Sequence, residues 1–308
     1  MFFIGLGVFL TLYVSDLDGT LLDTRAGLSA YTRRALVSLI EQGVLFTVAT
    51  ARHLVSVQQI MGDLPLKLPV ITGNGAYLSN LHTGLHEFVN GMQKGLCESL
   101  FVLMRRHGAM PLISTSTSQG DRLYWQNLNN AGMHACVQDR QKTGDPRLRQ
   151  TKQLQSHLGD QVVCFTLIDR WEVLAVLQAE IQMLCGEAVE THLSQDIYSP
   201  EWPWLTVHDR LASKDQAIQR LMTMHGLTER ELVVFGDAEN DVRMFKAAHR
   251  GIAVSNAIDE VKQHAKQIIG AHHEDSVVRF IETDWRGGTP PLNARHYQGE
   301  AAHLDVKH

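Results

Sequence analysis

Two acidic clusters stand directly after runs of apolar residues, where several carboxylates can act together. The first is Asp16-Leu17-Asp18-Gly19-Thr20, and it follows the apolar run 10–15. The second is Gly236-Asp237-Ala238-Glu239-Asn240-Asp241, and it follows the apolar run 232–235. A turn or a helix cap explains one acidic residue at such a place, but it does not require Asp237, Asn240 and Asp241 together. Clustered carboxylates suit a hard cation such as Mg²⁺, which takes oxygen ligands.

Three further polar residues have an ordinary structural reading beside a functional one. Thr50 is either the cap of a helix that begins near His53 or a ligand for a phosphate group, because anions bind where backbone N–H groups point at a helix start. Lys214 is either a solvated lysine at a helix start or a phosphate ligand. Asn74, within Gly73-Asn74-Gly75, is either a turn residue or a substrate contact. The residue types alone leave these alternatives open.

The elements around these residues predict a parallel sheet. Strands are expected at 10–15, 44–49 and 69–72, with helices at 29–43 and from residue 53 between them, which is the order of strands joined by crossover helices. Ligands bind at the carboxyl ends of the strands in such sheets. The acidic clusters, Thr50–Arg52 and Asn74 all follow predicted strands, so we expect them at that edge.

The pattern changes after residue 75. Segments 76–80 and 85–89 predict an antiparallel hairpin. Helices are then expected at 92–107 and 171–185, and strands at 111–114, 122–125 and 162–168. The parallel pattern is expected again from Leu205, with helices at 214–225, 240–248, 257–265 and 274–283 and strands at 232–235 and 251–254. The predicted fold class is therefore α/β. It has a doubly wound, Rossmann-like core from residues 9–81 and 196–284, an inserted α+β domain from 82–195, and a loose tail from 285–308.

Composition excludes several classes of protein. The 308 residues are 44% hydrophobic and carry a net charge of -5, which fits a globular chain and argues against binding nucleic acid through phosphate neutralisation. No G-x-G-x-x-G follows a predicted strand, which argues against a dinucleotide oxidoreductase. The apolar first 14 residues are too short to span a membrane, and residues 1–8 are expected to be a loose extension. Four cysteines without disulfide or metal spacing predict free thiols and a cytoplasmic location.

Taken together, these residues resemble the haloacid dehalogenase superfamily of phosphatases. More narrowly, they resemble the Cof-type subgroup, in which a large α+β cap of the C2B type is inserted between the second and third motifs. The matching residues, in motif order, are Asp16-Leu17-Asp18-Gly19-Thr20, Thr50 with Arg52, Lys214, and Gly236-Asp237-x-x-Asn240-Asp241, with Asn74-Gly75-Ala76 and Asn256-Ala257 as lesser agreements. The chain departs from the pattern at Ala51 and Asp215, where the family usually has glycine.

The resemblance implies a mechanism. Asp16 would attack phosphorus and form an aspartyl-phosphate, while Asp18 would protonate the leaving oxygen and then activate water. The implied ligands of Mg²⁺ are Asp16, the backbone carbonyl of Asp18, and Asp237, with Asp241 in support. Thr50, Lys214 and Asn240 would bind the phosphoryl oxygens, and Arg52 and Asn74 would be secondary substrate contacts.

The expected substrates are small phosphorylated metabolites, such as sugar phosphates or pyridoxal phosphate. The cap would close over the core and contact the organic part of the substrate. The expected state is a monomer or a small homo-oligomer, with neither nucleic acid nor membrane as a partner. Two alternatives remain on the same scaffold: a phosphosugar mutase, and a non-catalytic protein that binds a phosphorylated ligand.

Overall fold

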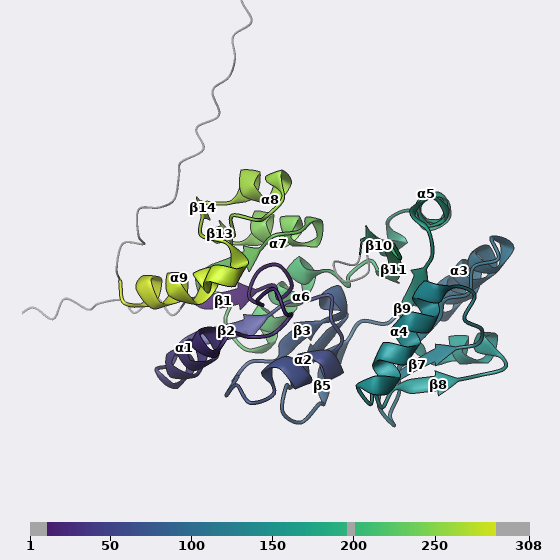
Figure 1. Ribbon diagram of the computed structural model, residues 1–308, viewed down its shortest axis with the longest axis horizontal. Helices are drawn as coiled ribbons and strands as arrows, with labels where there is room; N and C mark the ends of the chain where they lie inside the picture. Colours follow the sequence, from purple (N-terminus) through teal and green to yellow (C-terminus); the bar gives the residue numbers. More distant parts are fainter. Residues whose placement is uncertain (1–10, 196–200, 288–308) are drawn as a thin grey trace, which may run out of the picture. The chain divides into compact units, whose positions relative to one another are not determined.

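The computed structural model describes residues 11–195 and 201–287 (Figure 1). The extension expected at residues 1–8, and the expected tail apart from its first three residues, lie outside this range. The chain divides into two compact units, of which the first is Met1–Phe46 with Arg230–His308 and the second is Thr47–Glu229. Among the described residues, no helix is both long enough and apolar enough to cross a membrane.

The first unit is built around a parallel sheet. Its strand order is β14-β13-β12-β1-β2, and the pairs β1 with β12, β12 with β13, and β13 with β14 are parallel. The division between the units falls within β2. The elements of this unit are β1 (Leu12–Ser15), α1 (Ala30–Glu41), β2 (Leu45–Val48), β12 (Leu232–Gly236), η4 (Glu239–Asp241), α7 (Val242–Ala247), β13 (Arg250–Ala253), α8 (Asp259–His264), β14 (Gln267–Ile268), η5 (His272–Glu274) and α9 (Ser276–Trp285).

Helices cover both faces of this sheet. Phe280 of α9 packs edge-on against Phe235 of β12, with ring centroids 5.5 Å apart. Phe245 of α7 lies against Gly251 of β13, which is in register with Val234. Because successive side chains of a strand point to opposite faces, α9 and α7 lie on opposite sides of the sheet. This arrangement confirms the predicted α/β class with a doubly wound parallel core.

The second unit contains two further sheets. One is a sheet of order β3-β4-β5, and the other has the order β10-β11-β9-β6-β7-β8. In the second sheet the pairing is antiparallel except between β7 and β8. The elements of this unit are α2 (Leu54–Met61), β3 (Val70–Thr72), η1 (Gly73–Gly75), β4 (Tyr77–Ser79), β5 (His86–Val89), α3 (Lys94–Arg106), β6 (Leu112–Ser116), β7 (Arg122–Trp125), α4 (Ala131–Lys142), β8 (Leu148–Gln150), η2 (Leu154–Gly159), β9 (Gln161–Ile168), α5 (Trp171–Cys185), η3 (Gly186–Ala188), β10 (Val189–Ser194), β11 (Trp204–Asp209) and α6 (Lys214–Met224).

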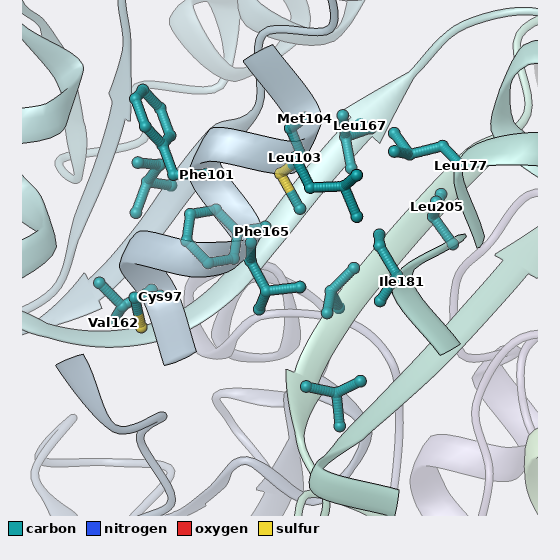
Figure 2. Packing of buried hydrophobic residues seen from close by; sticks show 14 of the residues in the cluster. Cys97, Phe101, Leu103, Met104, Val162, Phe165, Leu167, Leu177, Ile181 and Leu205 are labelled. Carbon is teal, nitrogen blue, oxygen red and sulfur yellow. The ribbon is translucent and has the colours of Figure 1, made fainter. Parts of the chain in front are cut away.

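The larger sheet is held by an apolar cluster between its strands and two helices. Figure 2 shows Phe101 and Met104 of α3 near Phe165 of β9, and Ile181 of α5 near Leu205 of β11. These side chains are buried, and burying each is worth about 1.5–3 kcal/mol. The periodic apolar residues that predicted helices at 92–107 and 171–185 therefore form the faces of α3 and α5 that pack on this sheet.

The structure differs from the sequence-based expectation in the pairing of β3 and β11 and at helix α4. The hairpin of β4 and β5 is antiparallel as predicted, but β3 also pairs antiparallel with β4, and its parallel contact is a single bridge from Ala49 to Ile71. The parallel pattern does not return at Leu205, because β11 pairs antiparallel with β9 and β10. Helix α4 was not predicted. The division into a core of 9–81 and 196–284 and a cap of 82–195 stays a prediction.

The cysteines are free thiols, as expected. Cys97, Cys136 and Cys164 are buried, and Cys185 is partly exposed. Burial raises the pKa of Cys97 to about 12 and that of Cys164 to about 11, so these thiols stay protonated and unreactive at neutral pH.

Candidate active site

Three carboxylates meet at the carboxyl ends of β1 and β12. Oxygen atoms of Asp16, Asp237 and Asp241 lie within 4.8 Å of one another. Asp16 follows β1 directly, and its backbone N–H still donates to the carbonyl of Phe235 on β12 at 2.9 Å. Asp16 and Asp241 are buried and Asp237 is partly exposed. The sequence placed these residues at one edge of a parallel sheet, and the structure brings them together there.

Neighbouring groups orient the carboxylates of this cluster. Thr20 Oγ1 donates to Asp237 Oδ1 at 2.6 Å. Asp241 Oδ2 accepts hydrogen bonds from the backbone N–H groups of Asp237 at 2.9 Å and Ala238 at 3.0 Å. Asp241 therefore stabilises the turn that positions the side chain of Asp237.

The donor set fits a magnesium ion. Carboxylates this close to one another repel when buried, and a divalent cation relieves that repulsion. Oxygen ligands are the ones that Mg²⁺ prefers. Asp18 and Asn240, the other polar residues of the two motifs, are partly exposed.

Two glycines allow the carboxylates to pack against the backbone. Gly19 has a φ of +73°, and a Cβ there would overlap the carboxylate of Asp237, lying 2.9 Å from its Cγ. A Cβ on Gly236 would lie 2.6 Å from Cγ of Asp241. The sequence contained these glycines within its motifs, but their role in the packing of the carboxylates becomes visible only in the structure.

The loop after β1 is tied to a distant part of the same unit. Asn256 Nδ2 donates to the carbonyl of Gly19 at 2.8 Å, and Asn256 Oδ1 accepts from the N–H of His272 at 2.9 Å. His272 Nδ1 donates to the carbonyl of Leu22 at 2.7 Å. Sequence reasoning noted Asn256 only as part of a motif and missed His272, which no spacing rule marks.

In the second unit, Thr50, Asn74 and Lys214 lie on neighbouring segments. The carbonyl of Thr50 accepts from the N–H of Asn74 at 2.9 Å. Asn74 has a left-handed φ of 55°, a conformation that asparagine tolerates. Gly75, with a φ of +101°, approaches the residue before Lys214 so closely that a Cβ would lie 2.5 Å from the carbonyl carbon of Ser213.

Two of the ordinary readings of these residues are wrong. Lys214 is only 2% exposed, so it is not a solvated lysine at a helix start. The N-cap of α2 is His53, whose Nδ1 accepts from the N–H of Ser56 at 3.2 Å. Thr50 is thus not the cap, and its Oγ1 instead accepts from the N–H of Arg52 at 3.1 Å. Arg52 Nη1 donates to Ser56 Oγ at 2.9 Å.

Comparisons with known proteins agree with this arrangement. The sequence matches the family described as haloacid dehalogenase-like hydrolase over residues 13–281. It is 26% identical to the pyridoxal phosphate phosphatase YbhA of Escherichia coli over 272 residues, covering 86% of this chain and 95% of that protein. It is 28% identical to the HMP-PP phosphatase of Yersinia enterocolitica over 283 residues, covering 87% of this chain and 92% of that protein.

The fold is also similar to solved structures. A haloacid dehalogenase-like hydrolase from Bacteroides thetaiotaomicron superposes with a TM-score of 0.71 at 22% sequence identity, covering 88% of this chain and 98% of that one.

Proposed function

Because this chain belongs to the haloacid dehalogenase-like hydrolases, we propose that it is a magnesium-dependent phosphatase that hydrolyses small phosphomonoesters through an aspartyl-phosphate on Asp16. The observation that supports this most directly is the cluster of Asp16, Asp237 and Asp241 at the ends of two parallel strands. A buried carboxylate at that edge is suited to nucleophilic attack on a phosphoryl group whose charge is neutralised.

Each predicted residue has a part in this proposal. Asp16, Asp237, Asp241 and the carbonyl of Asp18 would hold Mg²⁺. When bound, the ion neutralises charge on the phosphoryl group and on the carboxylates. Asp16 attacks phosphorus, the ester bond to the leaving oxygen breaks, and Asp18 gives that oxygen a proton. Asp18 then takes a proton from the water that attacks the aspartyl-phosphate, which releases inorganic phosphate and restores Asp16.

The phosphoryl oxygens would be bound by side chains from three segments. In this proposal Thr50, Lys214 and Asn240 donate to them, and Arg52 and Asn74 contact the rest of the substrate. Lys214 is buried, and a buried lysine is stabilised by anionic groups around it, which suits a residue of a phosphate site. The Thr50–Asn74 hydrogen bond and the close approach of Gly75 to Ser213 hold three of these residues on adjacent backbone.

The substrate class follows from the relatives and from the insert. The two relatives above are named for action on pyridoxal phosphate and HMP-PP, and at 26–28% identity they support a small phosphorylated metabolite as the class of substrate. We assign selection of the organic part to the predicted cap, residues 82–195. The predicted cytoplasmic location is part of the same proposal.

The proposal is tested by measuring phosphate release from a panel of small phosphomonoesters with and without Mg²⁺. The wild type is compared with Asp16→Asn and with the control Asp259→Asn, which removes an exposed carboxylate from α8 in the same unit. We expect Mg²⁺-dependent release that Asp16→Asn abolishes and Asp259→Asn retains. Undiminished release by Asp16→Asn would exclude Asp16 as the nucleophile.

The same panel separates the two alternatives. A phosphosugar mutase would return the phosphoryl group to the sugar, so isomerised sugar phosphate would form in place of free phosphate. A non-catalytic protein would bind esters without converting them.

A further inference from the structure

Three arginines of the second unit act electrostatically on His53, and we call Arg52, His53, Arg140 and Arg147 the arginine cluster. Arg52 and His53 precede α2, Arg140 lies in the last turn of α4, and Arg147 lies between α4 and β8. The segments are joined by a hydrogen bond of 3.3 Å from Gln59 Nε2 on α2 to the carbonyl of Thr143, the C-cap of α4.

The electrostatics of His53 reflect this grouping. Burial and the guanidinium groups of Arg147 and Arg140 hold the pKa of His53 well below its usual range, and Arg52 acts in the same direction. The one carboxylate among the charged groups with the largest effects on His53 is Asp145. His53 is therefore neutral at physiological pH, and the charged groups that act on it most strongly are three guanidinium groups and one carboxylate.

Two of the guanidinium groups are held in fixed positions. Arg147 forms a two-pronged pair with the buried Asp145, with Nε–Oδ1 at 2.9 Å and Nη2–Oδ2 at 2.7 Å. Arg140 lies over the ring of Trp204, 5.3 Å from its centroid, and its Nη1 donates to the carbonyl of Cys136 at 3.1 Å. Asp145 thus positions the guanidinium group of Arg147.

The cluster also presents donors suited to an anion. The buried Nε of Arg140 has no hydrogen-bond partner among the residues that the structure describes. A buried donor without a partner is destabilising, and an anionic ligand would remove that destabilisation. Since Nδ1 of neutral His53 accepts from Ser56, its proton is on Nε2, which makes Nε2 a donor as well.

The cluster adjoins a residue already placed in the proposed phosphatase. The N–H of Arg52 donates to Oγ1 of Thr50, the proposed phosphoryl ligand, at 3.1 Å. Guanidinium groups match phosphate and carboxylate groups through paired hydrogen bonds. We propose, resting on the proposed function, that the arginine cluster binds a second acidic group of the substrate, a phosphate or carboxylate distinct from the phosphoryl group that is hydrolysed. The preferred substrates are then phosphomonoesters with a second anionic group.

The proposal is tested with a series of substrates in which the distance between the two acidic groups varies. Alkanediol bisphosphates of three to eight carbons are compared with hydroxyalkyl monophosphates of the same length. The variants are Arg140→Met, Arg140→Lys, and the control Arg149→Met, which removes an exposed arginine whose Nη1 donates to the carbonyls of Pro146 and Leu148. Phosphate release gives kcat and KM for each pair.

We expect the wild type to prefer bisphosphates by about tenfold or more in kcat/KM at one or more lengths, as a charged hydrogen-bonded contact allows. Arg140→Met should remove that preference through KM and leave the monophosphates within about twofold, and Arg140→Lys should restore part of it. Arg149→Met should change neither. The proposal would be overturned if the wild type had the same kcat/KM for bisphosphates and monophosphates. It would also be overturned if Arg140→Met lowered kcat/KM equally for both series.

A binding measurement separates this inference from the phosphatase itself. If the wild type released no phosphate from any ester, the proposed function would fail. Calorimetric titration of the same bisphosphates without Mg²⁺ would still report on the cluster. Binding that is about tenfold weaker in Arg140→Met than in Arg149→Met supports the subsite, and indistinguishable binding overturns it.

Discussion

Gly19→Ala is expected to damage the carboxylate cluster more than the stability of the fold. The new Cβ would lie 2.9 Å from Cγ of Asp237, whereas carbon atoms in contact are about 3.5–4.0 Å apart. The carboxylate of Asp237 must therefore move by roughly 0.6–1 Å. A displacement of about 1 Å in a catalytic group can reduce the rate about 100-fold.

The backbone adds a separate cost. Gly19 has a φ of +73°, and a side chain in the left-handed region costs roughly 1–2 kcal/mol. Gly43→Ala is the matched control in the same unit, because Gly43 has a φ of +97° and a Cβ added there would meet no atom within 4 Å. Both variants should lose a similar free energy of unfolding, and only Gly19→Ala should also lose activity.

The assay combines urea denaturation with phosphate release over a range of Mg²⁺ concentrations. We expect kcat/KM to fall about 100-fold in Gly19→Ala, with a higher Mg²⁺ concentration for half-maximal activity. Gly43→Ala should retain wild-type kinetics. Wild-type kinetics and an unchanged Mg²⁺ requirement in Gly19→Ala would refute the reasoning that this glycine makes room for Asp237.

Two further predictions concern metal and pH. Mg²⁺ at about ten times its dissociation constant should stabilise the wild type by about 1.4 kcal/mol, which is seen as a rise of a few degrees in Tm. Asp237→Asn should lose that rise, and the control Asp259→Asn should keep it. A full rise in Asp237→Asn would exclude Asp237 as a ligand of the ion. Burial, with a contribution from His192, lowers the pKa of His208 to about 3, so the folded state stays neutral while the unfolded state binds a proton below pH 6.5. The free energy of unfolding should therefore fall as pH falls from about 6.5 toward 3. Between pH 7 and 5, denaturant titrations should show that the wild type loses about 2 kcal/mol more of this free energy than His208→Leu. Equal losses in the two proteins would contradict the lowered pKa of His208.

Where one physical signal dominates, the sequence predicted the structure closely. Helix α5 spans Trp171–Cys185 and strand β7 spans Arg122–Trp125, as expected from their apolar periodicity and from the turns around them. The acidic clusters were placed at one edge of the parallel sheet because strand order and residue type both pointed there. The structure brings Asp16, Asp237 and Asp241 together at that edge.

Other features depend on contacts between distant residues. Helix α4 has little apolar periodicity, and the signal that was available was Asn130, whose side chain caps it by accepting from the N–H of Met133 at 2.8 Å. The sequence of β11 is typical of a buried strand in a parallel or an antiparallel sheet. Only its pairing with β9 in the structure shows that it is antiparallel. His272 reaches the carbonyl of Leu22 across 250 positions of the chain, which no local pattern reveals.

The pairing of β1 with β12 has a consequence for how the protein is made. Leu12 of β1 pairs with Leu232 of β12, so β1 can pair with β12 only after about 220 further residues have been synthesised. Their synthesis takes roughly 10–45 s at cellular rates of translation. The second unit, Thr47–Glu229, is one uninterrupted stretch whose residues all leave the ribosome before β12. The nascent chain therefore carries Asp16 from the start but completes its carboxylate cluster among its final folding events.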